Sequence, residues 1–201
     1  MVTLYVDADD TILDSSKAVI EILNEKYNLS PAKTILDLED WNYHSICDEV
    51  TAAEVTEIYN SKDFFDRVKI KKGFENFWRR HKDKFSLKIV TKGTSENLRR
   101  KEEYFAKYLP EAEVIGVGFI TDTLSDFGKG HIDMTGGIQI DDRTDSLNTN
   151  APIKILITHG MQLPWNQYLG EYDKESVYIL ENWDLIEESL LFFYEHPEFI
   201  N

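Results

Sequence analysis

Cross-links and membrane spans are both missing from this sequence of 201 residues. It has a single cysteine, Cys47, so an internal disulfide and a cysteine-based zinc site are excluded. Its mainly apolar segments, such as residues 153–157, are far too short to cross a bilayer, and no membrane partner is expected. The first residues show neither the basic region nor the cleavage site of a signal peptide, so we expect a cytoplasmic protein.

Positive charge is scarce. The chain has 22 lysines and arginines against 37 aspartates and glutamates, which gives a formal net charge of −15. A field of that sign repels the phosphate backbone of a nucleic-acid polymer, so none is expected as a partner. A small phosphate ester is still compatible with this charge, because a bound cation and a few local lysines can reverse the sign inside a pocket.

Short apolar segments alternate with amphipathic ones along most of the chain. Strands are predicted at residues 2–6, 87–90, 113–119, 137–140, 152–157 and 176–180, and helices at 15–27, 74–81, 95–108 and 183–194. This alternation predicts an α/β fold in which a Rossmann-like parallel sheet is sandwiched by helices and joined by right-handed crossovers.

Residues 16–70 depart from this alternation, because they are rich in aromatic residues and helix formers and contain few strand signals. We therefore expect a small helical cap of residues 16–70, inserted after the first strand. The core domain would then comprise residues 1–15 and 71–201. A cap of this kind closes over a site and excludes water.

Asp7 and Asp9 directly follow the first strand. A turn there lets both carboxylates reach one point, where their repulsion would keep one of them protonated. Mg²⁺ prefers oxygen ligands and would remove that repulsion. The alternative is an acidic loop that caps the next helix.

A second carboxylate pair, Asp141 and Asp142, follows the strand at residues 137–140. In parallel sheets ligands gather at the carboxyl ends of the strands, so this pair can supply further ligands to the same metal ion. Alone it is equally typical of a turn. The two pairs together are more specific than either.

Three residues are candidates for binding phosphate. Thr91 follows the predicted strand at residues 87–90, and with Lys92 it precedes a glycine and a helix start that can hold phosphate oxygens. A plain helix cap is the alternative. Lys129 lies between two later strands and can neutralise a nucleophile and a phosphate, although most single lysines are solvated surface residues.

In this order the segments resemble the motifs of the haloacid dehalogenase-like phosphatase superfamily. Residues 7–11, Asp-Ala-Asp-Asp-Thr, match its first motif (DxDxT), Thr91 its second, Lys129 its third, and Asp141 with Asp142 its fourth. The match spans roughly residues 1–15 and 70–160.

A narrower resemblance, to the 5'(3')-deoxyribonucleotidase family, covers nearly the whole chain. It is carried by residues 63–65, 72–74, 140–147, 156–160, 164–166 and 182–183. Two positions depart from that family. Lys92 stands where it usually has a second small hydroxyl residue, and Asp10 stands where many members have glycine.

The resemblance implies that Asp7 attacks phosphorus and forms an aspartyl-phosphate. Asp9 would protonate the leaving alkoxide and then activate water. Mg²⁺ would lie between the Asp7 carboxylate, the backbone carbonyl of Asp9 and Asp141, aided by Asp142. Members of the narrower family are often dimeric, so a homodimer is the assembly that the resemblance implies.

The same resemblance implies a nucleoside monophosphate as substrate. Trp41, Phe64 and Phe65 are candidates for stacking on the base, a contact worth about 1–3 kcal/mol. Trp41 is the first choice, because its polar neighbours Asp40 and Asn42 indicate a loop. Of Phe64 and Phe65, one is expected to pack the core of the cap instead.

Two other functions stay open. The first is a phosphatase of the same fold that acts on another small ester, such as a sugar phosphate. The second is a non-enzymatic receiver-like module, which also places an aspartate near Mg²⁺ at a strand end. Asp9 as acid and base, and the insertion of more than fifty residues, argue against a receiver.

Overall fold

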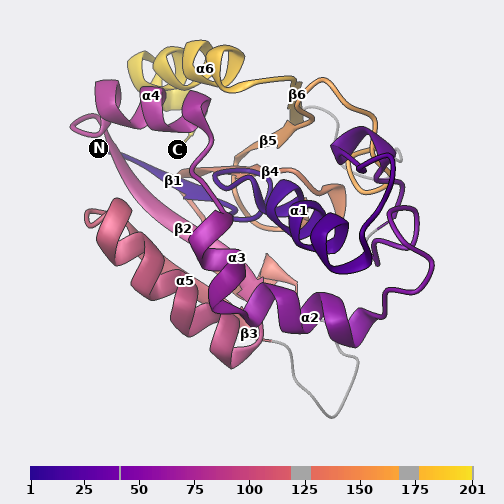
Figure 1. The fold of residues 1–201 in the computed structure, drawn as a ribbon. Coiled ribbons are helices and arrows are strands. Elements are labelled where there is room, and N and C mark those ends of the chain that lie inside the picture. The colour runs from indigo at the N-terminus through magenta and orange to yellow at the C-terminus, as the bar shows by residue number, and fades with distance from the viewer. Residues whose placement is uncertain (41, 119–127, 168–176, 201) are drawn as a thin grey trace.

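A computed structural model describes residues 1–40, 42–118, 128–167 and 177–200 of the chain. Its sheet contains β1 (Val2–Val6), β2 (Phe85–Gly93), β3 (Glu113–Gly118), β4 (Gly137–Asp141), β5 (Ile153–Ile157) and β6 (Val177–Leu180). The spatial order is β3-β2-β1-β4-β5-β6, and every neighbouring pair is parallel (Figure 1). The predicted α/β fold with a parallel sheet is confirmed. The predicted strand ends at residues 119 and 176 lie outside the described residues.

The helices are α1 (Ser15–Tyr27), α2 (Ala52–Asn60), α3 (Lys62–Arg67), α4 (Lys72–His81), α5 (Ser95–Tyr108) and α6 (Trp183–Glu195). Short 3₁₀ turns are η1 (Ile35–Asp37), η2 (Lys129–His131), η3 (Thr144–Leu147) and η4 (Pro197–Phe199). Helices α4 and α6 pack on each other, and α5 packs on β2 and β3. Within the described part of the chain, no helix has the length and apolar character to cross a membrane.

The central strands β1, β4 and β5 are buried on both faces, as their apolar residues require, whereas the edge strands β3 and β6 are partly exposed. Along β1, Leu4 and Val6 point into the main core, whereas Tyr5 between them joins a smaller cluster on the opposite face. That smaller cluster includes Met134 and Ala151 from the segments around β4. The central strand β1 is therefore held rigidly, and so is the start of the loop that follows it.

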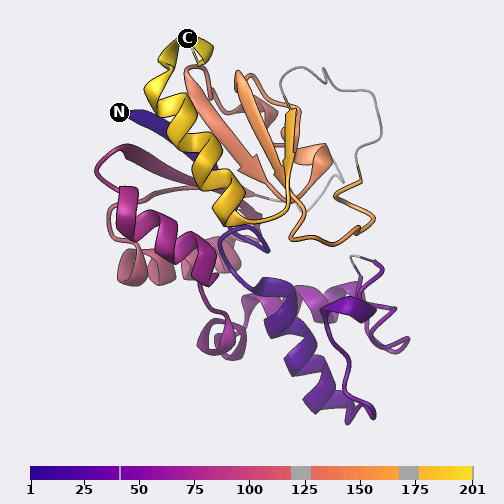
Figure 2. The same ribbon diagram turned by 90° about the horizontal axis from the view of Figure 1, so that it is seen from above.

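Between β1 and α4 the chain forms α1, α2 and α3, which contact one another, while α2 also contacts α5. Figure 2 shows these helices to one side of the sheet. Two backbone hydrogen bonds join the outgoing and returning chain, Asp14 N to Lys69 O at 2.9 Å and Lys71 N to Ile12 O at 2.7 Å. The chain thus leaves and re-enters the sheet layer at one place.

Strand β2 is longer than predicted. It runs to Gly93, because Thr91 and Gly93 still pair with Gly116 and Gly118 of β3. The polar sequence after Val90 predicts a loop, but the neighbouring strand continues alongside and keeps it extended. Thr91 is therefore inside the strand and not after its end.

Candidate functional site

Asp7 and Asp141 are placed level with each other by the register of two parallel strands. Val6 of β1 pairs with Ile140 of β4, and Asp7 N donates to Ile140 O at 2.9 Å. The next residue, Asp142, turns into the same space. Carboxylate oxygens of the three aspartates lie within 4.8 Å of one another.

Lys129, from η2, lies between two of these carboxylates. Its Nζ donates to Asp7 Oδ1 and, at 2.6 Å, to Asp141 Oδ2. The side chain is 2% exposed. Burial alone would lower the pKa of Lys129, but the carboxylates of Asp141 and Asp7 raise it above its ordinary value. Lys129 is therefore a buried, charged group that holds both strand ends together.

The carboxylates are poorly solvated. Burial raises the pKa of Asp7 to about 7; Lys129 opposes this rise, while Asp141 and Asp9 add to it. Burial, followed by the charges of Asp7 and Asp141, raises the pKa of Asp142 well above its ordinary range. The cluster thus holds more carboxylates than its lysines can neutralise.

This donor set fits a divalent cation with a preference for oxygen ligands. Asp9 is close to the cluster, so four carboxylates face two buried ammonium groups, which leaves two negative charges. Mg²⁺ would neutralise them. The Asp9 carboxylate lies outside the three-aspartate cluster, because it bonds to Ser15 and Lys101. Of the predicted metal ligands, Asp9 can therefore contribute only its backbone carbonyl.

In the metal-free protein, Asp7 is expected to lower stability as the pH rises. Its pKa is raised on folding, so its stabilising contribution is complete below pH 4 and is lost as the pH passes through about 7. Asp7→Asn removes this loss. We expect the melting temperature of Asp7→Asn to exceed that of the metal-free wild type by about 4 °C or more at pH 8, equivalent to roughly 1–2 kcal/mol, and by much less at pH 5.

Thermal melts of both proteins in EDTA at the two pH values measure this difference. An equal difference at pH 5 and pH 8 would show that burial does not destabilise the Asp7 carboxylate.

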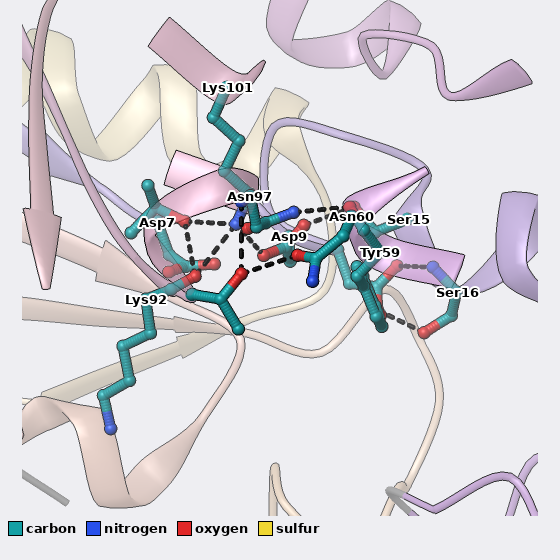
Figure 3. A network of polar contacts seen from close by, with 12 residues as sticks. Asp7, Asp9, Ser15, Ser16, Tyr59, Asn60, Lys92, Asn97 and Lys101 are labelled. Atoms are coloured by element: carbon teal, nitrogen blue, oxygen red, sulfur yellow. Dashed lines mark hydrogen bonds and ion pairs between the residues drawn. The ribbon is translucent and has the colours of Figure 1, made fainter. Parts of the chain in front are cut away.

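Asp9 is held by two donors. Ser15 Oγ donates to Asp9 Oδ1 at 2.7 Å, and Lys101 Nζ donates to Asp9 Oδ2 (Figure 3). Lys101 comes from α5 and is completely buried. It was not expected at the site, since the segment 95–108 has the pattern of a charged surface helix. The available signal was its spacing of four residues from Phe105 and from Asn97, both of which are also buried.

The three predicted phosphate-binding residues differ in where their side chains lie. Thr91 is completely buried, and its Oγ1 accepts from Lys101 Nζ at 2.7 Å. The backbone oxygen of Lys92 accepts a hydrogen bond from Lys101 Nζ at 3.0 Å. The side chain of Lys92 points away from Asp7 and Asp9 in Figure 3. Lys129 is the one of the three that contacts Asp7.

A cavity of about 270 Å³ opens between the carboxylate cluster and α2. Its core side includes Asp7, Asp9, Lys129 and Asp142. Its α2 side is formed by Val55, Thr56, Tyr59 and Asn60. The other described lining residues are Lys92, Gly93, Thr94, Asn97, Arg143 and Ser146. A small ester bound here would touch the carboxylates at one end and α2 at the other.

Two of the predicted stacking residues, Phe64 and Phe65, are not brought to this cavity. Phe64 is completely buried with its ring 5.0 Å from that of Tyr59, and Phe65 lies against Tyr104 at 6.1 Å. Neither belongs to the described lining of the cavity. Trp41 lies outside the described residues. Among the described residues, the aromatic side chain that lines the cavity is Tyr59, which was not predicted as a stacking residue.

Two hydrogen bonds fasten α2 to the start of α5. Thr94 Oγ1 donates to Asn60 Oδ1 at 2.6 Å, and Asn97 Nδ2 donates to Tyr59 O at 2.7 Å. A Cβ at Gly93 would come within 2.4 Å of Asn97 Oδ1, so glycine is required for this close approach. The cavity wall on the α2 side is thus tied to the sheet side.

Asp10 has a physical reason to stand where many members of the nucleotidase family have glycine. Its φ is +53°, a left-handed conformation that glycine adopts freely and aspartate tolerates. Its carboxylate accepts from Ser16 N at 2.9 Å, and its backbone oxygen accepts from His159 Nε2 at 2.6 Å. Asp10 therefore stabilises the turn that presents Asp7 and Asp9.

The comparisons with known proteins agree with this architecture. No protein-family model matches the chain, and no curated protein sequence matches it. Among solved structures, it is similar to a haloacid dehalogenase-like family hydrolase from Xanthomonas campestris, with a TM-score of 0.55, 12% identity and 98% of each chain covered. The haloacid dehalogenase-like family hydrolase SP0104 from Streptococcus pneumoniae gives a TM-score of 0.58 and 15% identity, with 96% of this chain and 98% of that chain covered.

A third similar structure is the HAD-hydrolase YfnB from Bacillus subtilis bound to magnesium. It gives a TM-score of 0.54 at 14% identity, over 94% of this chain and 98% of that chain. Over nearly its whole length, the chain therefore has the fold of haloacid dehalogenase-like hydrolases. The narrower resemblance to deoxyribonucleotidases stays a prediction.

Proposed function

We propose that this protein is a magnesium-dependent phosphomonoesterase that works through an aspartyl-phosphate at Asp7. The observation that carries the proposal is the arrangement of Asp7 level with Asp141, bridged by Lys129, on the wall of a cavity that Asp9 also lines. The fold shared with haloacid dehalogenase-like hydrolases supports it.

Asp7 is the nucleophile. Lys129 holds its Oδ1, and within the described part of the chain Oδ2 has no hydrogen-bond donor. Oδ2 attacks phosphorus, the bond from phosphorus to the leaving oxygen breaks, and Asp9 gives that oxygen a proton. Water then attacks phosphorus, Asp9 takes its proton, and the bond between phosphorus and Oδ2 breaks to release inorganic phosphate.

Asp7, Asp141 and Asp142, with the backbone carbonyl of Asp9, would hold Mg²⁺. When bound, the ion supplies positive charge beside the phosphate and so lowers the repulsion between two anions. Lys129 donates two of its three N–H groups to aspartates, so the third is available to a phosphate oxygen. The magnesium-bound hydrolase of the same fold supports this assignment.

A nucleoside monophosphate is the substrate class that we infer. Tyr59 offers an aromatic ring and Val55 an apolar contact on the α2 side of the cavity, in the place of the predicted Phe64 and Phe65. The second candidate is a sugar phosphate, favoured by the polar side chains of Thr56 and Asn60 on the same wall.

A phosphate-release screen with Mg²⁺ over deoxy- and ribonucleoside monophosphates and sugar phosphates tests both the phosphatase activity and the substrate class. We expect the best nucleotide to exceed the best sugar phosphate by at least about tenfold in kcat/KM, roughly 1.4 kcal/mol of extra transition-state binding. A preferred sugar phosphate would contradict the nucleotidase assignment and leave the phosphatase. Failure to release phosphate from any ester would contradict both.

A further inference from the structure

Lys101 is buried beside the reacting groups, yet it does not belong to the described lining of the cavity. Its Nζ donates to Asp9 Oδ2, to Thr91 Oγ1 at 2.7 Å and to the backbone oxygen of Lys92 at 3.0 Å. An ammonium group has three N–H donors, so all of them are used by the protein itself. No donor is left for a substrate.

Lys129 differs in this respect. It lines the cavity, and in the described residues its Nζ donates to Asp7 and Asp141 only. One N–H therefore stays free to meet a phosphate oxygen. Each buried lysine thus contacts one of the two aspartates. Lys129 contacts the nucleophile and lines the cavity. Lys101 contacts Asp9 (Figure 3).

The contacts of Asp9 indicate which of its two tasks Lys101 serves. Oδ1 accepts from Ser15 Oγ and Oδ2 accepts from Lys101 Nζ, so both oxygens are fixed as acceptors. These two donors fix the orientation of the carboxylate and leave its remaining lone pairs available to a water molecule on the cavity side. Asp9 nevertheless lines the cavity, with 22% of its side chain exposed.

We propose that Lys101 is a positioning residue that, together with Ser15, holds Asp9 as the general base for hydrolysis of the aspartyl-phosphate. The proposal rests on the proposed function. In this step water attacks phosphorus and its proton passes to Asp9, while the bond from phosphorus to Asp7 Oδ2 breaks. Loss of Lys101 releases one oxygen of Asp9 and slows this second step more than the first.

The test uses p-nitrophenyl phosphate with Mg²⁺, because the p-nitrophenolate leaving group needs little help from an acid. For Lys101→Met we expect kcat to fall by about 10²-fold, in the range that one acid–base group contributes. The value of kcat/KM, which reports formation of the phosphoenzyme, stays within about threefold of wild type. Acid quenching during turnover then traps a larger fraction of phosphorylated protein.

Lys107→Met is the matched control, since it makes the same change at an exposed position on the same helix. If Lys101→Met does not fold, Lys101→Gln is measured by the same criterion, because it keeps hydrogen-bond donors while losing the charge. A parallel fall of kcat and kcat/KM without extra phosphoenzyme would overturn the proposal, as would wild-type kinetics. A wild type that releases phosphate from no ester, p-nitrophenyl phosphate included, would overturn the proposed function and this inference with it.

Discussion

Asp7→Asn is expected to abolish phosphate release, with a fall in kcat of at least about 10³-fold, because loss of a nucleophile lowers kcat by at least this factor. The amide has nearly the shape of the carboxylate but is a much weaker nucleophile. Lys129 and Asp141 keep their own contact at 2.6 Å, so the strand ends stay joined and the protein stays folded. The fall in kcat is measured as phosphate release from the best ester of the screen with saturating Mg²⁺.

Asp48→Asn is the matched control for this variant. Asp48 is an exposed aspartate of the segment before α2, so the same chemical change there leaves turnover unaffected. Circular dichroism and thermal melts of both variants establish that each is folded. Turnover by Asp7→Asn near the wild-type rate would exclude Asp7 as the nucleophile.

Removal of divalent cations with EDTA is expected to lower turnover by at least about 10²-fold. Several kcal/mol of charge stabilisation come from a metal ion in such reactions, and the two uncompensated negative charges of the aspartate cluster would repel a phosphate. Excess Mg²⁺ restores the activity. Ca²⁺ restores less, because it prefers more ligands at longer distances than three carboxylates and a carbonyl supply.

The same titration has a readout that is independent of turnover. Binding of Mg²⁺ to the folded protein raises the melting temperature, and the rise is larger at pH 8 than at pH 5, because the carboxylate of Asp7 must be ionised to bind. Full activity in EDTA, together with a melting temperature that Mg²⁺ leaves unchanged, would contradict a metal site at Asp7, Asp141 and Asp142.

The fold could be predicted because each strand carries its own signal. Residues 2–6 and 153–157 are short, rich in β-branched residues and followed by a polar residue, so they are recognised without knowledge of their neighbours. The end of β2 could not be predicted, because residues 91–93 are extended only through their pairing with β3. Pairing with a distant strand cannot be recognised from the few residues of the sequence around position 91.

The residues of the candidate site also differ in whether the sequence alone could predict them. Asp7 and Asp141 directly follow apolar strands, and parallel strands bring their carboxyl ends to one edge, so their meeting is a consequence of topology. Lys101 and Tyr59 lie within helices and face the site only because α5 and α2 pack where they do. The sequence marks the inward-facing Lys101 only by its spacing of four residues from Asn97 and Phe105, and this spacing does not identify the site that it faces.

The central claim is that phosphorus becomes bonded to Asp7, and the most direct measurement is chemical trapping of that bond. The protein is quenched during turnover of p-nitrophenyl phosphate with Mg²⁺, treated with borohydride, which reduces an aspartyl-phosphate to homoserine, and analysed by peptide mass spectrometry. We predict homoserine at position 7, in larger amount in Asp9→Asn because the second step is slowed, and none in Asp7→Asn. Homoserine at Asp141 or Asp142, or no conversion in Asp9→Asn while phosphate is still released, would contradict the account.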